Sequence, residues 1–337
     1  MAVAYGLLAG GGLCARVGER MLDLSGVAGS LDELMARGPD GWTPPLEGPE
    51  LDAPGLAMPF TVADYVDFYS SLHHARNVGL MFRPDDEPLL PNWRQMPVGY
   101  HGRAGTVVPS GTPVRRPSGQ LGEGEFAPTR ALDVELELGF VIGVPSEGPV
   151  PVERALDHVF GAVLLNDWSA RDIQGWEYRP LGPFLGKSFA TSISQWVVPL
   201  SELERFRVEI EPPDPEPLPY LREAAWAYDI PLELELNGAV VARSNARHLY
   251  WSIAQQIAHL TSNGASLRVG DLLGTGTISG PERDQRGCLL ELSWAGREPI
   301  ELPDGSTRTF LEDGDEVVLR GEPLGEVGGK VFRSDPF

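Results

Sequence analysis

The sequence predicts a mainly β protein of the α+β class. Among its 337 residues are 40 glycines and 31 prolines, an excess that favours many turns between short strands. Apolar and polar residues alternate along 131–143, which is the pattern of a β-strand. The segment 232–244 alternates on both sides of Asn237-Gly238, and this predicts a β-hairpin with a two-residue turn. The length suits one large domain or two ordinary ones.

Residues 1–58 form the first predicted unit. Two short strands bounded by glycine are expected first, followed by a helix with Ser30 as its N-cap and Gly38 beyond its end. The proline-rich segment 42–59 has no periodic pattern and is typical of a linker. We therefore expect a small β-rich domain at 1–58 and a larger domain at 59–337.

Two helices are expected in the larger domain. Residues 70–77 predict a helical turn that carries His73 and His74, close to an aspartate and a tyrosine. Structural and catalytic roles both remain open for this histidine pair. Residues 249–267 predict the clearest helix of the chain, because apolar residues recur there at helical spacing.

A carboxylate interrupts an apolar segment near the C-terminus. Residues 288–294 are interpreted as a strand in which Glu291 is flanked by leucines. An unpaired buried carboxylate is costly, so Glu291 needs a histidine, a cation or a hydrogen-bond donor as its partner. The segment 309–321 predicts a closing hairpin.

The composition excludes several classes of partner. A net charge of −21 argues against binding nucleic acid or an anionic membrane surface. No apolar run approaches the length of a membrane-spanning helix. The two cysteines, Cys14 and Cys288, are too few for a disulfide framework, so we expect a cytoplasmic protein. Of 27 basic residues, only Lys187 and Lys330 are lysine, and Lys187 lies inside a polar segment.

That polar segment runs from Asn166 to Lys187. Arg171, Gln174 and Tyr178 are spaced at i, i+3 and i+7, so a helix over 169–178 would place them on one face. We expect Asp167 or Ser169 to cap this helix. An anion-binding site and an ordinary surface helix are both compatible with the pattern.

Two glutamates lie on one face of the strand predicted at 131–143. Glu135 and Glu137 are two residues apart, so their like charges repel unless a cation lies between them. A shared cation and a solvent-facing edge are the two interpretations. Glu233 and Glu235 repeat the spacing elsewhere, which shows how little the pattern means by itself.

Several motifs together resemble one family. They include DFYSSLHHARNVG at 67–79, PNWRQMPVGYHGR at 91–103, LDVELELGF at 132–140, NDWSARDIQGWEYRPLGPFLGKSF at 166–189 and LLELSW at 289–294. In this order the motifs resemble those of the fumarylacetoacetase (fumarylacetoacetate hydrolase) family. The resemblance covers the chain from about residue 60 to the end. The resemblance implies a small, shortened SH3-like β-barrel at 1–58, followed by a mixed β-roll catalytic domain at 59–337 that forms a homodimer.

The resemblance also assigns roles to residues. It implies that Asp67, Glu135, Glu137 and Asp167 bind Ca²⁺ or Mg²⁺, with Lys187 and Thr191 near a second, magnesium-type site. It implies that His74 is the catalytic base held by Glu291, that Arg171, Gln174 and Lys187 stabilise charge, and that Tyr69, Arg83, Tyr100, Gln174, Tyr178 and Thr277 contact the substrate. The chain departs from the family at Leu72-His73 and at Ala190, where a glycine is usual.

The implied activity is hydrolysis of a carbon–carbon bond in a small diketo-acid. In this family a histidine activates water that attacks a metal-chelated 1,3-diketone, and 4-fumarylacetoacetate yields fumarate and acetoacetate in the last step of tyrosine and phenylalanine degradation. One alternative is a superfamily relative that hydrolyses, decarboxylates or isomerises an acylpyruvate or another oxo-acid. A more remote alternative is a cation-stabilised binding protein without turnover.

Overall fold

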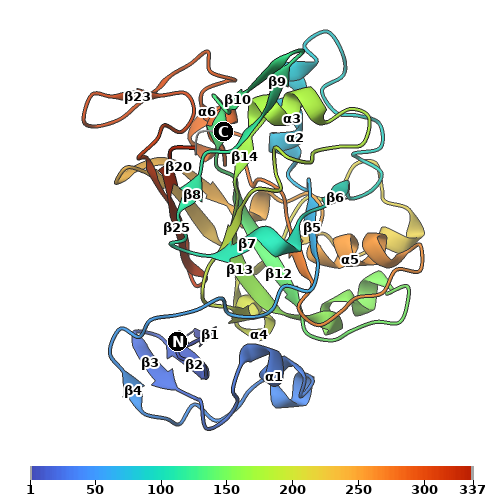
Figure 1. Cartoon of the computed structure of the whole chain (residues 1–337). Helices are drawn as coiled ribbons and strands as arrows, with labels where there is room; N and C mark the ends of the chain where they lie inside the picture. Colours follow the sequence, from blue (N-terminus) through green and yellow to red (C-terminus); the bar gives the residue numbers. More distant parts are fainter. Residues whose placement is uncertain (1, 335–337) are drawn as a thin grey trace.

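The computed structural model describes residues 2–334 and has one central β-sheet around which the other elements pack (Figure 1). In spatial order its strands are β6 (Gly99–His101), β5 (Tyr65–Phe68), β21 (Leu272–Gly274), β12 (Leu136–Ile142), β13 (Val159–Asp167), β15 (Thr191–Ile193) and β7 (Val107–Pro109), with β16 (Val198–Pro199) also paired to β13. The prediction of a mainly β protein is confirmed. Residue 1 and residues 335–337, the outer ends of the two predicted domains, lie outside the described residues.

Both faces of the central strands are buried. Along β12 and β13, alternate side chains enter two different hydrophobic cores: Leu138 and Leu164 pack in the larger core, whereas Val141 and Val163 pack in the smaller one. Each such apolar side chain contributes about 1.5–3 kcal/mol when it is buried. Because no face of β12 meets solvent, Glu137 is an interior residue. A solvent-facing edge is therefore the wrong interpretation of the glutamate pair.

A second sheet contains the predicted hairpin. Its strands are β20 (Ala239–Asn245), β19 (Pro231–Leu236), β24 (Glu316–Gly321), β25 (Gly325–Phe332) and β8 (Val114–Arg115). At the turn between β19 and β20, Asn237 has φ of 52° and Gly238 of 81°, as a two-residue hairpin requires. Glu233 and Glu235 on β19 form ion pairs with arginines, and among the described residues they belong to no carboxylate cluster. The strand β24 pairs with β19 and with β25, and not with residues 309–315, so the hairpin expected within 309–321 is wrong in its pairing.

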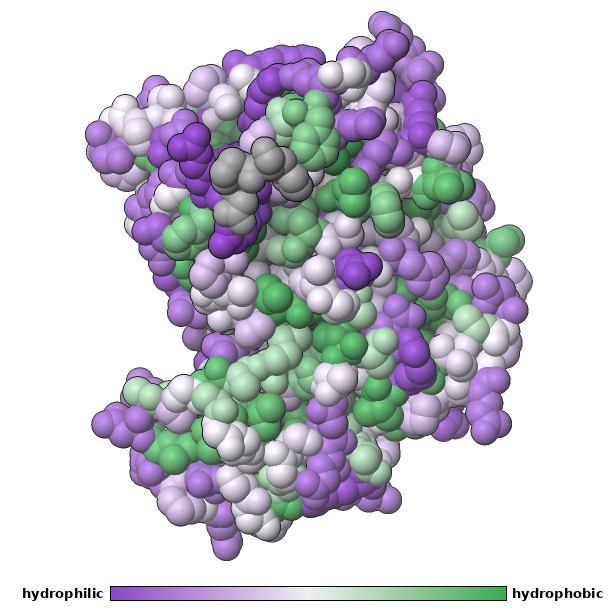
Figure 2. Space-filling view, in the orientation of Figure 1, coloured by the Kyte–Doolittle hydropathy of each residue, from purple (hydrophilic) through white to green (hydrophobic). Residues whose placement is uncertain are grey.

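The N-terminal unit is a separate lobe below the main body (Figure 1). It contains one antiparallel sheet, of β1 (Val3–Leu7), β2 (Leu13–Val17), β3 (Arg20–Asp23) and β4 (Glu50–Leu51), and the helix α1 (Leu31–Met35). The Ser30 hydroxyl accepts from the Glu33 amide at 3.1 Å, which confirms the predicted cap. Tyr5 exchanges two 2.8 Å backbone hydrogen bonds with Val197, and apolar side chains gather at this junction (Figure 2).

Two predicted helices are present with different bounds. The helical turn at 70–77 is the start of the longer α2 (Leu72–Phe82), whose N-cap is Ser71. The clearest helix becomes α5 (Ile253–Thr261), where Ser252 and Gln255 form a capping box.

The segment around Glu291 is a short helix, α6 (Leu289–Leu292), and the prediction of a strand is wrong. The carboxylate of buried Asp133 accepts from the Leu289 amide at 2.7 Å and from the Leu290 amide at 3.1 Å. An anion at the first amides of a helix stabilises that helix. Because Asp133 is remote in the chain, the local apolar pattern contained no sign of this contact.

The helix α3 (Arg171–Glu177) follows β13 as expected, but its predicted caps are wrong. Its N-cap is Ala170, which makes no side-chain capping bond. Asp167 ends β13, and Ser169 belongs to β14 (Ser169–Ala170). Strand pairing holds both residues extended, the Ser169 hydroxyl donates to the Asp167 carbonyl at 2.9 Å, and the Asp167 carboxylate accepts from Thr191, so neither side chain caps the helix.

Short elements complete the fold. The remaining strands are β9 (Ser118–Gly122) with β10 (Glu125–Pro128), β11 (Leu132–Asp133) with β14, β17 (Arg207–Glu209) with β18 (Trp226–Tyr228), and β22 (Ile300–Glu301) with β23 (Thr307–Arg308). The remaining helices are α4 (Leu200–Leu203) and the 3₁₀ segments Pro39–Gly41, Ala104–Thr106, Val152–His158, Glu204–Phe206, Pro219–Leu221, Ala246–His248 and Arg283–Gln285. No helix among the described residues is long and apolar enough to span a bilayer.

Candidate active site

Four buried carboxylates meet at one end of the central sheet. They are Asp67 of β5, Glu135 just before β12, Glu137 of β12 and Asp167 at the end of β13. One oxygen of each lies within 4.8 Å of the others. Strand pairing brings the four carboxylates together, because β12 pairs with both β13 and β21, and β21 pairs with β5.

Two cations neutralise one side of this cluster. The Lys187 ammonium lies 2.6 Å from Glu135 Oε2 and 2.8 Å from Asp167 Oδ2. Arg171 lies 2.7 Å from Glu135 Oε1 and 2.8 Å from Asp133 Oδ2. Burial opposes the charge of Glu135, but Lys187 and Arg171 outweigh it and lower the pKa of this carboxyl. Although burial acts against it, Asp167 and Glu135 raise the pKa of Lys187, so its nitrogen is protonated and has no lone pair for a metal.

The other side of the cluster lacks such compensation. Burial, and then the neighbouring Asp167, raises the pKa of Asp67 far above its usual range. Burial and Asp67 do the same to the pKa of Glu137. Asp67 Oδ1 and Glu137 Oε1 are buried and have no hydrogen-bond partner among the described residues. Unpaired carboxylate oxygens that converge in this way match the donor set that a hard divalent cation requires.

Two hydroxyl groups also touch the cluster. The Tyr100 hydroxyl lies 3.0 Å from Asp67 Oδ2 and 2.8 Å from Asp167 Oδ2. The Thr191 hydroxyl donates to Asp167 Oδ1 at 2.8 Å, because Thr191 and Asp167 are paired across β15 and β13. Both hydroxyl groups therefore belong to the immediate surroundings of the carboxylates.

A histidine and a carboxylate form a second arrangement. His74, in the first turn of α2, lies with Nδ1 2.6 Å from Glu291 Oε2, and both side chains are buried. Burial alone would raise the pKa of Glu291, but His74 and the hydrogen bonds to this carboxylate lower it to about 2. Glu291 is thus ionised at neutral pH and leaves Nε2 of the imidazole as the nitrogen that can accept a proton. The neighbouring His73 instead faces His248, with ring centroids 5.7 Å apart.

Three further residues hold Glu291 and were missed from the sequence. The Asn77 amide donates to Oε1 at 2.8 Å, and the Ser279 hydroxyl donates to Oε2 at 2.7 Å. The Cys288 thiol lies 3.2 Å from Oε2. Asn77 could have been found, since it is three residues after His74 on the same helix and so shares its face. Ser279 and Cys288 carried no comparable signal.

Two of the residues expected to contact substrate, Tyr69 and Gln174, touch these groups. Tyr69 packs edge-on against His74 with ring centroids 5.1 Å apart. Gln174 Oε1 accepts from Arg171 at 3.3 Å, and Tyr178 follows at the exposed end of α3. Arg83 donates to the Pro88 carbonyl at 2.8 Å. Buried polar atoms without a partner among the described residues include Arg83 Nε, Arg171 Nη2 and Thr277 Oγ1.

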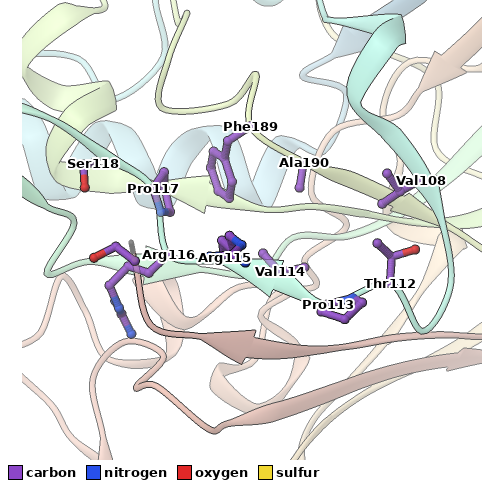
Figure 3. Close-up of a pocket in the computed structure, with 11 residues that line it drawn as sticks. Val108, Thr112, Pro113, Val114, Arg115, Arg116, Pro117, Ser118, Phe189 and Ala190 are labelled. Carbon is purple, nitrogen blue, oxygen red and sulfur yellow. The ribbon is translucent and has the colours of Figure 1, made fainter. Parts of the chain in front are cut away.

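Two pockets differ in their distance from this chemistry. One, of about 160 Å³, reaches Lys187, Tyr65 and Tyr100. The other, of about 440 Å³, is lined by residues of 108–118 together with Phe189 and Ala190 (Figure 3). Arg116 in that pocket is fully engaged with Asp313 and two backbone carbonyls. The smaller pocket is therefore the one that adjoins the candidate site.

Comparison with known proteins identifies the family. Residues 64–332 match the family described as "Fumarylacetoacetate (FAA) hydrolase C-terminal". The chain belongs to the fumarylacetoacetate hydrolase family. The fumarylacetoacetase of Bos taurus is 52% identical over 304 residues, which cover 84% of this chain and 73% of that protein. The human fumarylacetoacetase is 51% identical over 285 residues, which cover 80% of this chain and 68% of that protein.

Solved structures of more distant proteins share the fold of this fumarylacetoacetate hydrolase family member. A fumarylacetoacetate hydrolase from Exiguobacterium antarcticum aligns with a TM-score of 0.65 at 18% identity and covers 99% of both chains. The fumarylpyruvate hydrolase of Pseudomonas aeruginosa, in complex with Mn²⁺ and pyruvate, aligns with a TM-score of 0.54 at 22% identity, over 81% of this chain and 91% of that one.

Proposed function

We propose that this protein hydrolyses 4-fumarylacetoacetate to fumarate and acetoacetate, the last step of tyrosine and phenylalanine degradation. The observation that carries the proposal is the 2.6 Å contact between His74 and an ionised Glu291, close to four converging carboxylates. Relatives at about half identity are named fumarylacetoacetase, which supports this substrate. The chain is thus a hydrolase that acts on a carbon–carbon bond.

His74 acts as the general base. With Nδ1 bound to Glu291, its Nε2 takes a proton from water as the water oxygen bonds to a carbonyl carbon of the diketone, and the C=O π pair moves onto the carbonyl oxygen. The C=O bond then re-forms as the carbon–carbon bond breaks, and the electron pair of the broken bond passes to the departing acetoacetate carbon. Protonation of that carbon by the His74 imidazolium returns the base to its neutral form.

Donors near the carboxylates stabilise the charge that develops. Arg171 Nη2 and Thr277 Oγ1 are buried without a partner among the described residues, so each has a hydrogen bond to offer a substrate. Lys187 adds a fixed positive charge, and Gln174 orients Arg171. Loss of one donor of this kind costs roughly 10²–10³ in rate. We assign substrate binding to Arg83, Tyr69, Tyr100 and Tyr178.

A divalent cation belongs to this site. Asp67, Glu135, Glu137 and Asp167 would hold it, and when bound it polarises the two diketone oxygens. Ca²⁺ fits best, because it accepts about 6–8 oxygens and four carboxylates leave room for substrate. Mg²⁺ is the alternative, and the Mn²⁺ in the fumarylpyruvate hydrolase supports the class of metal. Lys187 and Thr191 would then lie next to the cation, and Lys187 would contribute a positive charge without binding the metal.

The family resemblance also indicates the oligomeric state. We infer a homodimer formed by the catalytic β-roll domain at 59–337, with the shortened SH3-like domain at 1–58, in the cytoplasm. The exposed apolar side chains Trp176, Leu181 and Phe184 support a subunit contact next to the site, because a soluble monomer rarely exposes a cluster of this kind. Sedimentation equilibrium would test the dimer.

The substrate is tested with a panel of oxo-acids. Purified protein, supplied with Ca²⁺ or Mg²⁺, is expected to consume fumarylacetoacetate, followed by its ultraviolet absorbance, and to release fumarate and acetoacetate. An acylpyruvate serves as the comparison substrate. Turnover of the acylpyruvate without turnover of fumarylacetoacetate would overturn the proposal.

A further inference from the structure

Tyr65 is a buried phenol that the proposed reaction does not use. It lies on β5 with 1% of its surface exposed, two residues before Asp67 and thus on the same face of the strand. A phenol has an ordinary pKa of about 10, so at neutral pH the Tyr65 oxygen carries a proton that can be donated. The hydroxyl nevertheless has no hydrogen-bond partner among the described residues. A buried donor left unpaired costs about 1–3 kcal/mol.

This hydroxyl lies next to the uncompensated half of the carboxylate cluster. A Cβ placed on Gly274 would be 3.3 Å from the Tyr65 oxygen, 2.7 Å from Asp67 Oδ1 and 3.2 Å from Glu137 Oε2. These polar atoms therefore surround one small space that the glycine leaves open. Asp67 Oδ1 also lacks a partner among the described residues. An unpaired donor thus lies beside an unpaired acceptor, Asp67 Oδ1, and beside Glu137 Oε2, which accepts from the Gly276 amide at 3.0 Å.

The second phenol at the cluster behaves differently. The Tyr100 hydroxyl lies within hydrogen-bonding distance of Asp67 and of Asp167, so its bonding is satisfied by the protein. Both tyrosines line the pocket of about 160 Å³ that adjoins Lys187. A water molecule can therefore reach Tyr65, and a polar space with several partners is where buried water is held.

We propose that Tyr65 is a positioning residue for the divalent cation. Its hydroxyl donates, through a bound water, to the oxygens of Asp67 and Glu137 and holds them in the orientation that the cation requires. Outer partners of this kind typically contribute about 10–100-fold to metal affinity. The inference rests on the proposed cation site, and it assigns this phenol a function that a phenylalanine could not perform.

The test compares two tyrosines. Tyr228 of β18 is also buried with an unpartnered hydroxyl, but it packs against Trp226 and Phe140 away from the cluster. The 337-residue wild-type chain and its Tyr65→Phe and Tyr228→Phe variants are freed of metal with a chelator, and Ca²⁺ is titrated by calorimetry. We expect Tyr65→Phe to raise the Kd for Ca²⁺ about 10-fold, whereas Tyr228→Phe leaves the Kd unchanged. Thermal melts of the metal-free proteins verify that both variants are folded.

The possible results separate the two proposals. If Tyr65→Phe binds Ca²⁺ as tightly as the wild type, the role of Tyr65 is wrong while the cation site stands. If Tyr228→Phe weakens binding equally, the effect is general packing and the inference also fails. If the wild type does not bind Ca²⁺, Mg²⁺ or Mn²⁺, the cation site itself is wrong and the inference falls with it.

Discussion

The buried carboxylates Glu137 and Glu291 lie in the same protein interior but have opposite surroundings. Glu291 accepts from Asn77, Ser279 and His74, and these contacts lower its pKa to about 2. Glu137 faces other carboxylates, and burial raises its pKa far above the usual range. The first site is complete within the chain, whereas the second has the charge and the free oxygens of a site that needs a cation.

Replacement of the base should have the largest effect. His74→Ala removes the group that we propose as the activator of water, and we expect kcat to fall by roughly 10²–10⁴-fold. The carboxylate cluster does not include His74, so the Kd for Ca²⁺ should be unchanged in calorimetric titrations. A variant that kept most of its activity would show that another group activates water.

Removal of each charge should change stability in opposite directions. The lowering of the Glu291 pKa from 4.5 to about 2 corresponds to about 3 kcal/mol, so Glu291→Gln should destabilise the metal-free protein by an amount of that order. Glu137→Gln removes a buried carboxyl whose ionised form is unfavourable in the fold and should stabilise the metal-free protein at neutral pH. Urea unfolding with a chelator present measures both, and a loss of stability in Glu137→Gln would contradict the contrast.

The pH dependence should also differ between the two sites. Asp67 and Glu137 have pKa values raised in the fold, so the native metal-free protein holds more protons than the unfolded chain. The contribution of these two carboxyls to stability is therefore greatest below about pH 4. It falls as pH rises towards their raised pKa, by up to about 1.4 kcal/mol per pH unit for each carboxyl. Glu291 has a lowered pKa, so its contribution is constant above about pH 5 and is lost on acidification towards pH 2.

Thermal melts between pH 5 and pH 8 would test this difference. With a chelator, the Tm of the wild type should fall as pH rises, and saturating Ca²⁺ should remove the fall. Glu137→Gln is the control, because it lacks one of the groups responsible and should show a shallower slope. Equal slopes with and without Ca²⁺ would argue against a cation at the carboxylates.

The smallest expected effect is at Cys288. Its thiol is a weak donor to Glu291, so Cys288→Ala should lower kcat by only about 2–5-fold, within the range of a single modest hydrogen bond. Cys288→Ser keeps a donor at the same position and should retain nearly the wild-type kcat. If serine and alanine lower kcat equally, the sulfur fills space and does not orient Glu291.

Neighbouring residues in the sequence were sufficient to predict several helix ends and turns. Ser30 starts α1, and Asn237-Gly238 turns the hairpin between β19 and β20, because caps and tight turns depend on neighbouring residues. The motif resemblance predicted that Asp67, Glu135, Glu137 and Asp167 share one cation. The structure brings these four carboxylates together.

Contacts between distant residues decided the rest. Asp133 accepts from the first amides of α6 and stabilises a helix where the sequence predicted a strand. Glu291 on this helix contacts His74. Which carboxylate oxygens remain unpaired also depends on side chains from separate strands. By itself, the sequence determined the types of group available, their local turns and their family. Only the tertiary structure decided which groups are satisfied and which need a ligand, since burial and hydrogen-bond partners arise from residues far apart in the chain.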